Sequence, residues 1–248
     1  MSRRKPSEQH VVQALLDAYR HGFFPMADPE ARPDRERLSH IYWCSPDPRG
    51  VLPLSEDEGF HAPRRLEQHI RSGRFIIRFD TAFARVMEGC ARPRRRRRGE
   101  GHDGGWIDST ILEWYCTLAR HGCAHSIEAW RTDPRTGRES LVGGVYGVSL
   151  GAAFFGESMF HIARARRPDG SQHPLDGTNA SSVCLVTLVR HLAACGYRLF
   201  DTQMVTDHVA RFGACLIPRE MYLKRLAEAI NEPDRWRPIP RATDHGSA

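Results

Sequence analysis

Apolar residues recur along this chain at spacings that alternate between those of helices and those of strands. Stripes with helical spacing, several followed by a glycine such as Gly22, Gly122 or Gly196, predict helices. These cover residues 8–21, 63–72, 80–90, 108–120 and 179–195, with shorter helices near 206–212 and 218–230. We expect Asp80 to cap the third helix, and Asp108 or Ser109 to cap the fourth. Runs rich in β-branched and aromatic residues predict strands at 75–79, 125–130, 141–148, 152–157 and 197–200.

Residues 27–60 interrupt this pattern because they are rich in Pro, Asp and Arg. Pro46, Pro48 and Pro53 lie too close together for a regular helix. We therefore expect residues 1–55 to form a small, irregular N-terminal domain and residues 56–248 to form a second domain. In the second part, strands alternate with helices around a central hairpin, which predicts an α/β or α+β domain of three layers.

The composition favours a reduced, cytoplasmic protein with a polyanionic partner. A net charge of +6 and a pI of about 9.1 suit a partner such as a nucleic acid. The seven cysteines are odd in number and form no Cys-x-x-Cys, which argues against disulfides and zinc sites. No apolar run is long enough to span a bilayer, and no secretory signal is visible. His121 and His125 do not have the spacing of standard zinc ligands, so we expect no metal and no cofactor.

Residues 141–160 are the most informative segment, because they hold a single charged residue, Glu157, among apolar residues and five glycines. A carboxylate in such surroundings is costly to bury, so it is expected to serve a purpose. The glycines allow a ligand or another backbone to approach closely. The segment therefore predicts a hairpin against which a ligand binds.

Asp201 and Gln203 form a second candidate site at the end of a predicted strand. Alternate residues of an extended strand point to the same side, so the two side chains should project together where α/β sheets bind ligands. A carboxylate can accept from the NH2 of an amide and so fix the amide oxygen as an acceptor. The alternative is a strand end that only caps the following helix.

The strongest charge run comprises Arg94, Arg95, Arg96, Arg97 and Arg98. Five adjacent guanidinium groups repel one another and should remain solvated, either in contact with a phosphate backbone or simply as an exposed loop. The sequence contains no Gly-x-Ser-x-Gly, no P-loop and no Gly-x-Gly-x-x-Gly between a strand and a helix. A serine hydrolase triad and the common nucleotide-binding loops are therefore poorly supported.

Taken in order, these segments resemble the leucyl/phenylalanyl-tRNA–protein transferase family. The resemblance covers roughly residues 10–225, and its most specific part is Gly-Glu-Ser-Met-Phe at 156–160 followed by Asp-x-Gln at 201–203. Further matching stretches are 15–25, Trp43, 45–49, 86–90, Trp106-Ile107, 125–130, the rest of 141–160, 179–181, Asp207-His208 and 213–219.

The resemblance implies a small N-terminal domain and a catalytic domain with the fold of the acyl-CoA N-acyltransferases (GNAT), that is, three α/β/α layers in the α+β class. It implies an aminoacyltransferase that moves Leu or Phe, with Met as a further candidate, from aminoacyl-tRNA to acceptor proteins with N-terminal Arg or Lys. The product carries a destabilising N-terminus that marks it for degradation. We expect a cytoplasmic monomer.

The resemblance also implies a site. Asp201 and Gln203 are expected to be catalytic, with Gln203 aligning the attacking amine because an amide is too weak a base to hold a proton. Asp201 would fix Gln203 and offset the charge of the amine. Trp106 is expected to stack on the terminal adenine. The other expected substrate-binding residues are Tyr19, Tyr115, Val145, Phe154, Gly156, Glu157, Met159 and Ser181.

The chain departs from the family pattern at several places. Met26 stands where a tryptophan is usual, Ser182 stands where a lysine is usual, and about a dozen residues are inserted around 163–177. Donor preference and the contact with tRNA are therefore less defined than the class of reaction. Two alternatives remain. A GNAT-fold acyl-CoA-dependent amine acyltransferase should carry a Gln/Arg-x-x-Gly-x-Gly/Ala loop, which we do not find. A non-catalytic tRNA-binding protein would not be expected to retain both Asp201 and Gln203.

Overall fold

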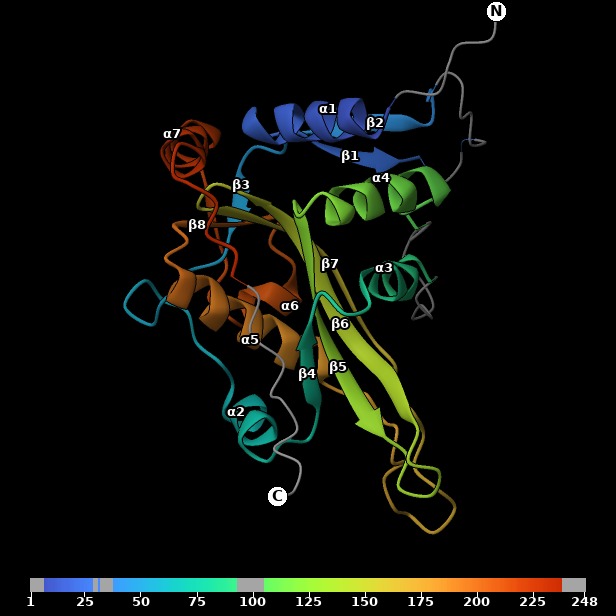
Figure 1. The fold of residues 1–248 in the computed structure, drawn as a ribbon. Coiled ribbons are helices and arrows are strands. Elements are labelled where there is room, and N and C mark those ends of the chain that lie inside the picture. Colours follow the sequence, from blue (N-terminus) through green and yellow to red (C-terminus); the bar gives the residue numbers. More distant parts are fainter. Residues whose placement is uncertain (1–6, 29–30, 32–37, 93–104, 238–248) are drawn as a thin grey trace, which may run out of the picture.

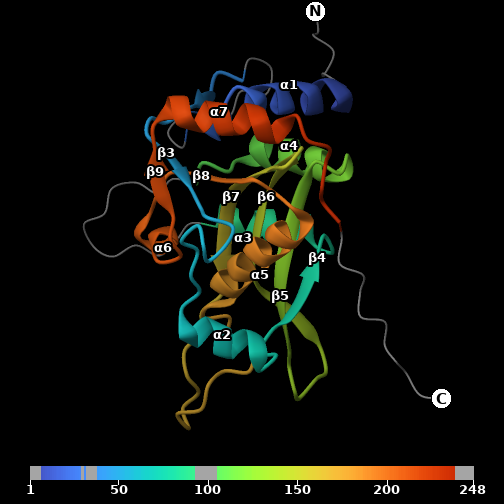
Figure 2. The same ribbon diagram turned by 90° about the vertical axis from the view of Figure 1, so that its left-hand side faces the viewer.

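The computed structural model describes residues 7–28, 31, 38–92 and 105–237. Its centre is a twisted seven-stranded sheet in which the pairings are antiparallel except for the parallel pair β7–β8 (Figures 1 and 2). In spatial order the strands are β4 (Ile76–Phe79), β5 (Ala124–Thr132), β6 (Glu139–Leu150), β7 (Ala153–His161), β8 (Leu199–Gln203), β3 (Arg49–Val51) and β9 (Cys215–Ile217). A separate hairpin pairs β1 (Phe24–Ala27) with β2 (Ile41–Cys44).

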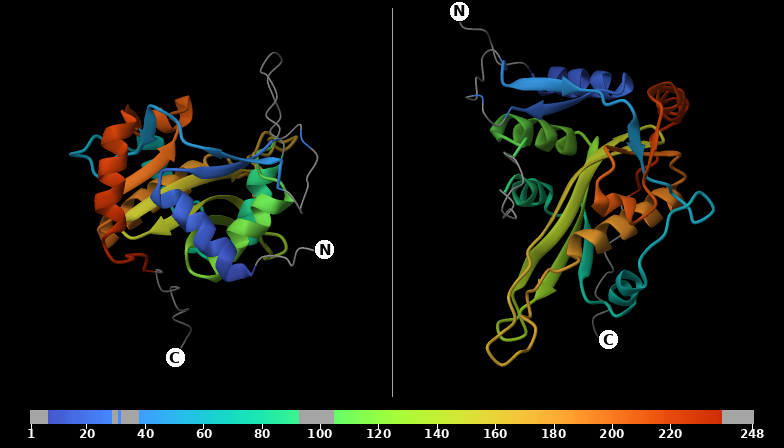
Figure 3. Two further views of the ribbon diagram at one scale, coloured as in Figure 1. Left: turned by 90° about the horizontal axis from the view of Figure 1, so that it is seen from above. Right: turned by 180° about the vertical axis from the view of Figure 1, so that it is seen from behind.

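Helices cover both faces of the sheet, which gives three layers. One face carries α1 (Glu8–Arg20), α3 (Phe83–Ala91), α4 (Ser109–Arg120) and α7 (Arg219–Ile230). The other face carries α2 (Arg64–Arg71), α5 (Ala180–Cys195) and α6 (Asp207–Ala210). Figure 3 shows α1 and the β1–β2 hairpin together at the end of the molecule where α4 lies. The arrangement confirms the predicted mixed α+β class.

Local signals explain where several of these helices begin and end. Asp108 accepts hydrogen bonds from the backbone N–H groups of Thr110 and Ile111, so it caps α4 as predicted. The prediction for Asp80 is wrong. Asp80 lies at φ +55°, and its carboxylate accepts from the Ser126 N–H and contacts His125. The carboxylate of Glu128, on β5, instead accepts from the backbone N–H groups that precede α3.

Four short strands were not predicted: β1, β2, β3 and β9. Three of them fall within or beside residues 27–60, which we expected to be irregular. The prolines there exclude a helix but permit a strand of three residues between Pro48 and Pro53. That strand, β3, pairs antiparallel with both β8 and β9. A piece of the first 55 residues thus belongs to the main sheet, and the domain division stays a prediction.

The two faces of the sheet bury separate hydrophobic clusters. One cluster joins Leu15 and Tyr19 of α1 with Tyr115 of α4, Phe155 of β7 and Tyr222 of α7. The other is centred on the apolar side chains of α5. No helix in the described part of the chain is both long enough and apolar enough to cross a membrane.

Candidate active site

The candidate site lies where strands β7 and β8 stop pairing. Their parallel pairing joins 153–155 with 199–201, while β7 continues to His161 and β8 to Gln203. A β-bulge sits at the same place, because Gly147 pairs with Gly156 and Tyr146 with Ser158. Glu157 is therefore the extra residue, without a partner on β6. Bulges change the direction of a side chain and are common beside active sites.

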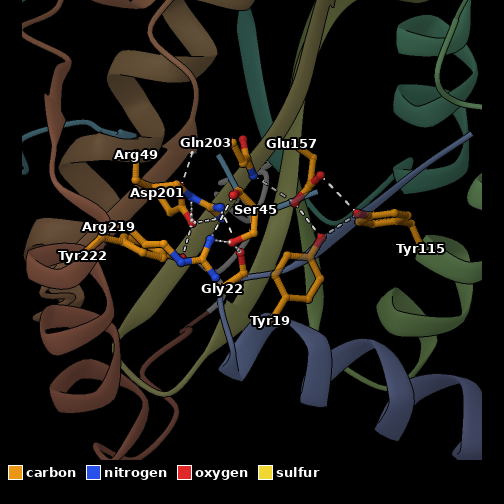
Figure 4. A network of polar contacts seen from close by, with 10 residues as sticks. All are labelled: Tyr19, Gly22, Ser45, Arg49, Tyr115, Glu157, Asp201, Gln203, Arg219 and Tyr222. Atoms are coloured by element: carbon orange, nitrogen blue, oxygen red, sulfur yellow. Dashed lines mark hydrogen bonds and ion pairs between the residues drawn. The ribbon is translucent and has the colours of Figure 1, made fainter. Parts of the chain in front are cut away.

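Glu157 is the centre of a polar cluster drawn from four elements (Figure 4). Its Oε1 accepts from the hydroxyl of Tyr19 on α1 at 2.6 Å and from Nε2 of Gln203 on β8 at 3.2 Å. Its Oε2 accepts from the hydroxyl of Tyr115 on α4 at 3.1 Å, and the two hydroxyls lie 2.5 Å apart. The structure thus brings together four of the predicted site residues. They are distant in sequence, because Tyr19 lies 96 positions before Tyr115 and 138 positions before Glu157.

Removal from water changes the acidity of this cluster. The pKa of Glu157 is raised to about 7, chiefly by burial and in smaller part by the charge of Asp201, while hydrogen bonds from Tyr19 and Tyr115 and the charge of Arg49 oppose the rise. Burial and the nearby Glu157 also hold the pKa of both tyrosines well above the ordinary value. The tyrosines are therefore protonated donors, and Glu157 is the group that can exchange a proton near neutral pH.

Asp201 is held differently from our expectation. It is completely buried, and it forms a bidentate ion pair with the equally buried Arg49. The distances are 2.7 Å from Nη2 of Arg49 to Oδ2 of Asp201 and 3.0 Å from Nε to Oδ1. Its Oδ2 also accepts from the hydroxyl of Tyr222 at 2.6 Å. Its contact with Gln203 is to the backbone N–H, at 2.7 Å. The acid that orients the Gln203 side chain is thus Glu157 and not Asp201.

Gln203 itself has a left-handed backbone, with φ +58°. Such a conformation is uncommon for a residue other than glycine, and it is stabilised here by the bond from its N–H to Asp201. β8 therefore ends in a turn at Gln203. The side chains of Asp201 and Gln203 do not follow the alternation of an extended strand, on which our expectation was based. Gly156 faces the same junction, where an added Cβ would come within 2.6 Å of the Phe200 ring.

Arg49 is a site residue that the sequence reasoning missed. Besides Asp201, it donates from Nη1 to the carbonyl oxygen of Gly22 at 2.9 Å. Burial alone would lower its pKa, but the ion pair with Asp201 raises it above the ordinary value, so the guanidinium stays charged. Nearby, Arg219 donates to the carbonyl oxygen of Ser45. The only signal for Arg49 in the sequence was its place in the stretch 45–49 that resembles the family.

The remaining predicted pocket residues lie apart from the Glu157 cluster. Val145 is buried in the hydrophobic cluster around α5, Met159 packs against that cluster, and the buried Ser181 contacts His161. Phe154 is also fully buried there, edge-on to Phe200 with ring centroids 5.6 Å apart. Phe154 therefore packs as a core residue in this structure, and its expected place in a pocket stays a prediction.

Two departures from the family pattern and the predicted residue Trp106 can also be located. Trp106 is half-buried, and its carbonyl oxygen accepts from Ala27 at the end of β1. Met26 lies on β1 beside the Tyr42 hydroxyl, and Ser182 is buried and contacts His208. Residues 94–98, the arginine run, lie outside the described residues. Among those described, no group of three or more His, Cys, Asp or Glu side chains is placed to hold a metal ion.

Comparison with known proteins supplies the family. The sequence model of the family described as leucyl/phenylalanyl-tRNA protein transferase matches residues 51–227, and the model of its N-terminal domain matches residues 12–47. The chain belongs to this family. A leucyl/phenylalanyl-tRNA–protein transferase from Nitrobacter winogradskyi is 42% identical over 230 residues, which are 93% of this chain and 87% of that protein. One from Caulobacter vibrioides is 43% identical over 223 residues, covering 90% and 87%.

Membership of the leucyl/phenylalanyl-tRNA–protein transferase family confirms the resemblance drawn from the sequence. The two regions that match the family models both contribute to the polar cluster, because Tyr19 belongs to the first, and Tyr115, Glu157 and Gln203 to the second. The cluster can hold an amine at Glu157 and Gln203, and it contains one group that changes charge near pH 7.

Proposed function

We propose that this chain is an aminoacyltransferase that moves Leu or Phe from aminoacyl-tRNA to the N-terminal Arg or Lys of acceptor proteins. The new peptide bond gives the acceptor a destabilising N-terminus that marks it for degradation. The observation that carries the proposal is the Glu157–Gln203 pair at the opening between β7 and β8, in a chain of this family. The protein would act as a cytoplasmic monomer without a metal or cofactor.

Gln203 aligns the attacking amine. Its NH2 group is committed to Glu157, which leaves the amide oxygen as an acceptor of fixed orientation for an N–H of the amine. Held in this way, the nitrogen can be presented to the carbonyl carbon of the aminoacyl ester. Positioning of two reactants accounts for much of the rate of such reactions, because the ester is already activated.

Glu157 accepts the proton that the α-ammonium must lose. An α-amine has a pKa of about 7.7–8.0, close to the pKa of about 7 of Glu157, so the transfer costs little. The neutral amine then attacks the ester carbon, a C–N bond forms, and the ester C–O bond breaks. As the C–N bond forms the nitrogen loses a second proton, which passes to the ribose oxygen that leaves with the tRNA, and Glu157 releases the first proton to water. Tyr19 and Tyr115 stabilise the carboxylate before it takes the proton.

Asp201 acts by positioning, because its charge is already balanced by Arg49 and it holds the backbone of Gln203. The donor side chain would lie against Val145, Gly156, Met159 and Ser181, where a flexible methionine accommodates Leu, Phe and Met. Trp106 would stack on the terminal adenine, and Arg94–Arg98 would contact the tRNA backbone. The parting of the parallel strands β7 and β8 supports a GNAT-like catalytic domain.

The test is a transfer assay with purified protein, labelled Leu-, Phe- and Met-tRNA, and a peptide that begins with Arg. We expect label in the peptide with Leu and Phe, and none in a matched peptide that begins with Ala. Transfer of a labelled acyl group from acyl-CoA instead would favour the alternative acyltransferase. Binding of tRNA without any transfer would favour a non-catalytic protein.

A further inference from the structure

Two arginine-rich loops project from the end of the molecule opposite α1 (Figures 1 and 2). One is the turn between β5 and β6, which carries the exposed Arg135 and Arg138. The other follows β7 as residues 162–177 and carries the exposed Arg164, Arg166 and Arg167. Neither loop contributes to the polar cluster around Glu157, and the proposed reaction uses none of these side chains.

The second loop is built around a buried acid. Asp176 is 2% exposed, and it accepts from the backbone N–H of Arg164 at 2.9 Å and from the guanidinium of Arg74 at 3.0 Å. Gln172 and Thr178 donate to the same carboxylate. Although burial would raise the pKa of Asp176, these hydrogen bonds hold it below the ordinary value. Both ends of the loop are also fixed, because the Ile162 N–H bonds to β6 and the Gly177 N–H bonds to Ile162.

Two further acids of the loops bind backbone of their own turns, whereas the side chains of the arginines are exposed. Asp133 and Asp169 accept from backbone N–H groups of their own turns, at Arg135 and Ser171. In contrast, the guanidinium groups of Arg135, Arg138, Arg164 and Arg167 make no hydrogen bond or ion pair with the other described residues. The loops therefore expose four guanidinium groups, two of which, Arg135 and Arg167, lie near the charge of an acid of their own loop. Exposed guanidinium groups in this number suit an anion with regularly spaced charges.

The distance from Glu157 to the second loop fits the nucleic-acid donor of the proposed function. From Glu157, β7 runs four residues to His161, a span of about 13 Å, and the second loop begins immediately after it. A stacked nucleic-acid strand covers that span in about four nucleotides, at about 3.4 Å each. If the aminoacyl ester is held at Glu157, phosphates several nucleotides away from the 3′ end reach the arginines.

We propose that these two loops bind the phosphate backbone of the tRNA donor beyond its unpaired 3′ end. The inference rests on the proposed function and adds a contact surface to it. It assigns the segment inserted around 163–177 to donor affinity and not to chemistry. Contacts with phosphates release counterions, so the affinity they provide must depend steeply on salt.

The test uses a variant in which Arg135, Arg138, Arg164 and Arg167 are all changed to Gln. The matched control changes four other exposed cations, Arg211, Lys224, Arg225 and Arg237, to Gln, so that both variants lose the same charge. Each is assayed with Leu-tRNA and with a minimal donor, leucyl-adenosine, which is too short to reach the loops. Binding of uncharged tRNA is measured separately, between 50 and 200 mM salt.

We expect the loop variant to have a raised KM for Leu-tRNA, an unchanged kcat, and normal activity with leucyl-adenosine. Four phosphate contacts make affinity fall about 150-fold between those salt concentrations, and most of that dependence should disappear in the loop variant but not in the control. Equal losses in the two variants, or an equal loss with leucyl-adenosine, would overturn the proposal. If the wild-type chain binds tRNA through the loops but transfers nothing, the surface stands and the proposed function fails.

Discussion

At the scale of single residues, the sequence singled out Glu157, Asp201 and Gln203 but not the bonds between them. Glu157 was recognisable because it is the only charge in residues 141–160. The pairing of Asp201 with Arg49 was not, because the two residues are 152 positions apart and nothing in either segment indicates the other. The expected lock between Asp201 and the Gln203 amide failed for a local reason, since the left-handed backbone of Gln203 ends the alternation of the strand.

Glu157→Gln tests the proposed proton transfer. The change preserves the shape of the side chain but removes the base, so kcat/KM should fall by about 10²- to 10⁴-fold. Because Glu157 must be ionised to accept a proton from the ammonium, the wild-type activity should rise with pH up to about 7 and then level off. The variant depends on amine that is already neutral, so its activity should continue to rise up to the pKa of the amine, about 7.7–8.0. Initial rates of transfer at a series of pH values, below the pKa of the acceptor amine, measure both effects.

Glu157 should also make the stability of the fold depend on pH, in the direction opposite to its effect on activity. Glu157 has a folded-state pKa above its ordinary value, so the folded state binds this proton more tightly than the unfolded state. Its contribution to stability is therefore greatest at low pH and is lost between about pH 4.5 and 7, by about 3 kcal/mol at most. A Glu157→Gln variant that kept full activity and the wild-type dependence of stability on pH would show that Glu157 neither takes part in the reaction nor has a raised pKa.

At the scale of elements, the long helices and the glycine-rich hairpin were predicted well, because their patterns extend over many residues. The short strands β3 and β9 were not, because three residues are too few to show a period. β3 nevertheless matters to the site. It lies between β8 and β9 and carries Arg49, so it supplies the counter-charge that allows Asp201 to be buried at the end of β8. β3, which no sequence pattern predicted, therefore holds the end of β8, which the sequence did predict.

The link between β3 and β8 can be measured with a double-mutant cycle. Arg49→Met leaves Asp201 charged and unpaired in the core, and Asp201→Asn leaves Arg49 unpaired, so each should lower the free energy of unfolding by about 3–5 kcal/mol. The double variant removes both charges and should recover much of the loss. Chemical denaturation gives the coupling energy. Additive effects of the two changes would contradict the ion pair, and activity in the double variant reports whether positioning of Gln203 needs the pair itself.

At the scale of the whole molecule, the two regions that match separate family models are joined by both apolar and polar contacts. Leu15, Tyr19 and Phe24 of the first region share a hydrophobic cluster with Phe155 and Tyr222 of the second. The carbonyl oxygens of Gly22 and Ser45, in the first region, accept hydrogen bonds from Arg49 and Arg219, which lie beyond that region. The site is therefore complete only when the first region is docked, since Tyr19 donates to Glu157 from α1.

This dependence predicts that the chain unfolds as one cooperative unit. Calorimetry should give a single transition whose calorimetric and van't Hoff enthalpies agree, because neither region buries its share of the common cluster alone. Leu15→Ala, which removes a buried side chain of α1, should cost about 2–5 kcal/mol and shift the whole transition without dividing it. Activity and the main unfolding signal should then be lost together on heating. Two separate transitions, or a first region that melts while the seven-stranded sheet stays folded, would show that docking of α1 is an independent step. In that case Tyr19 would reach Glu157 only part of the time, and the pKa of Glu157 would depend on that equilibrium.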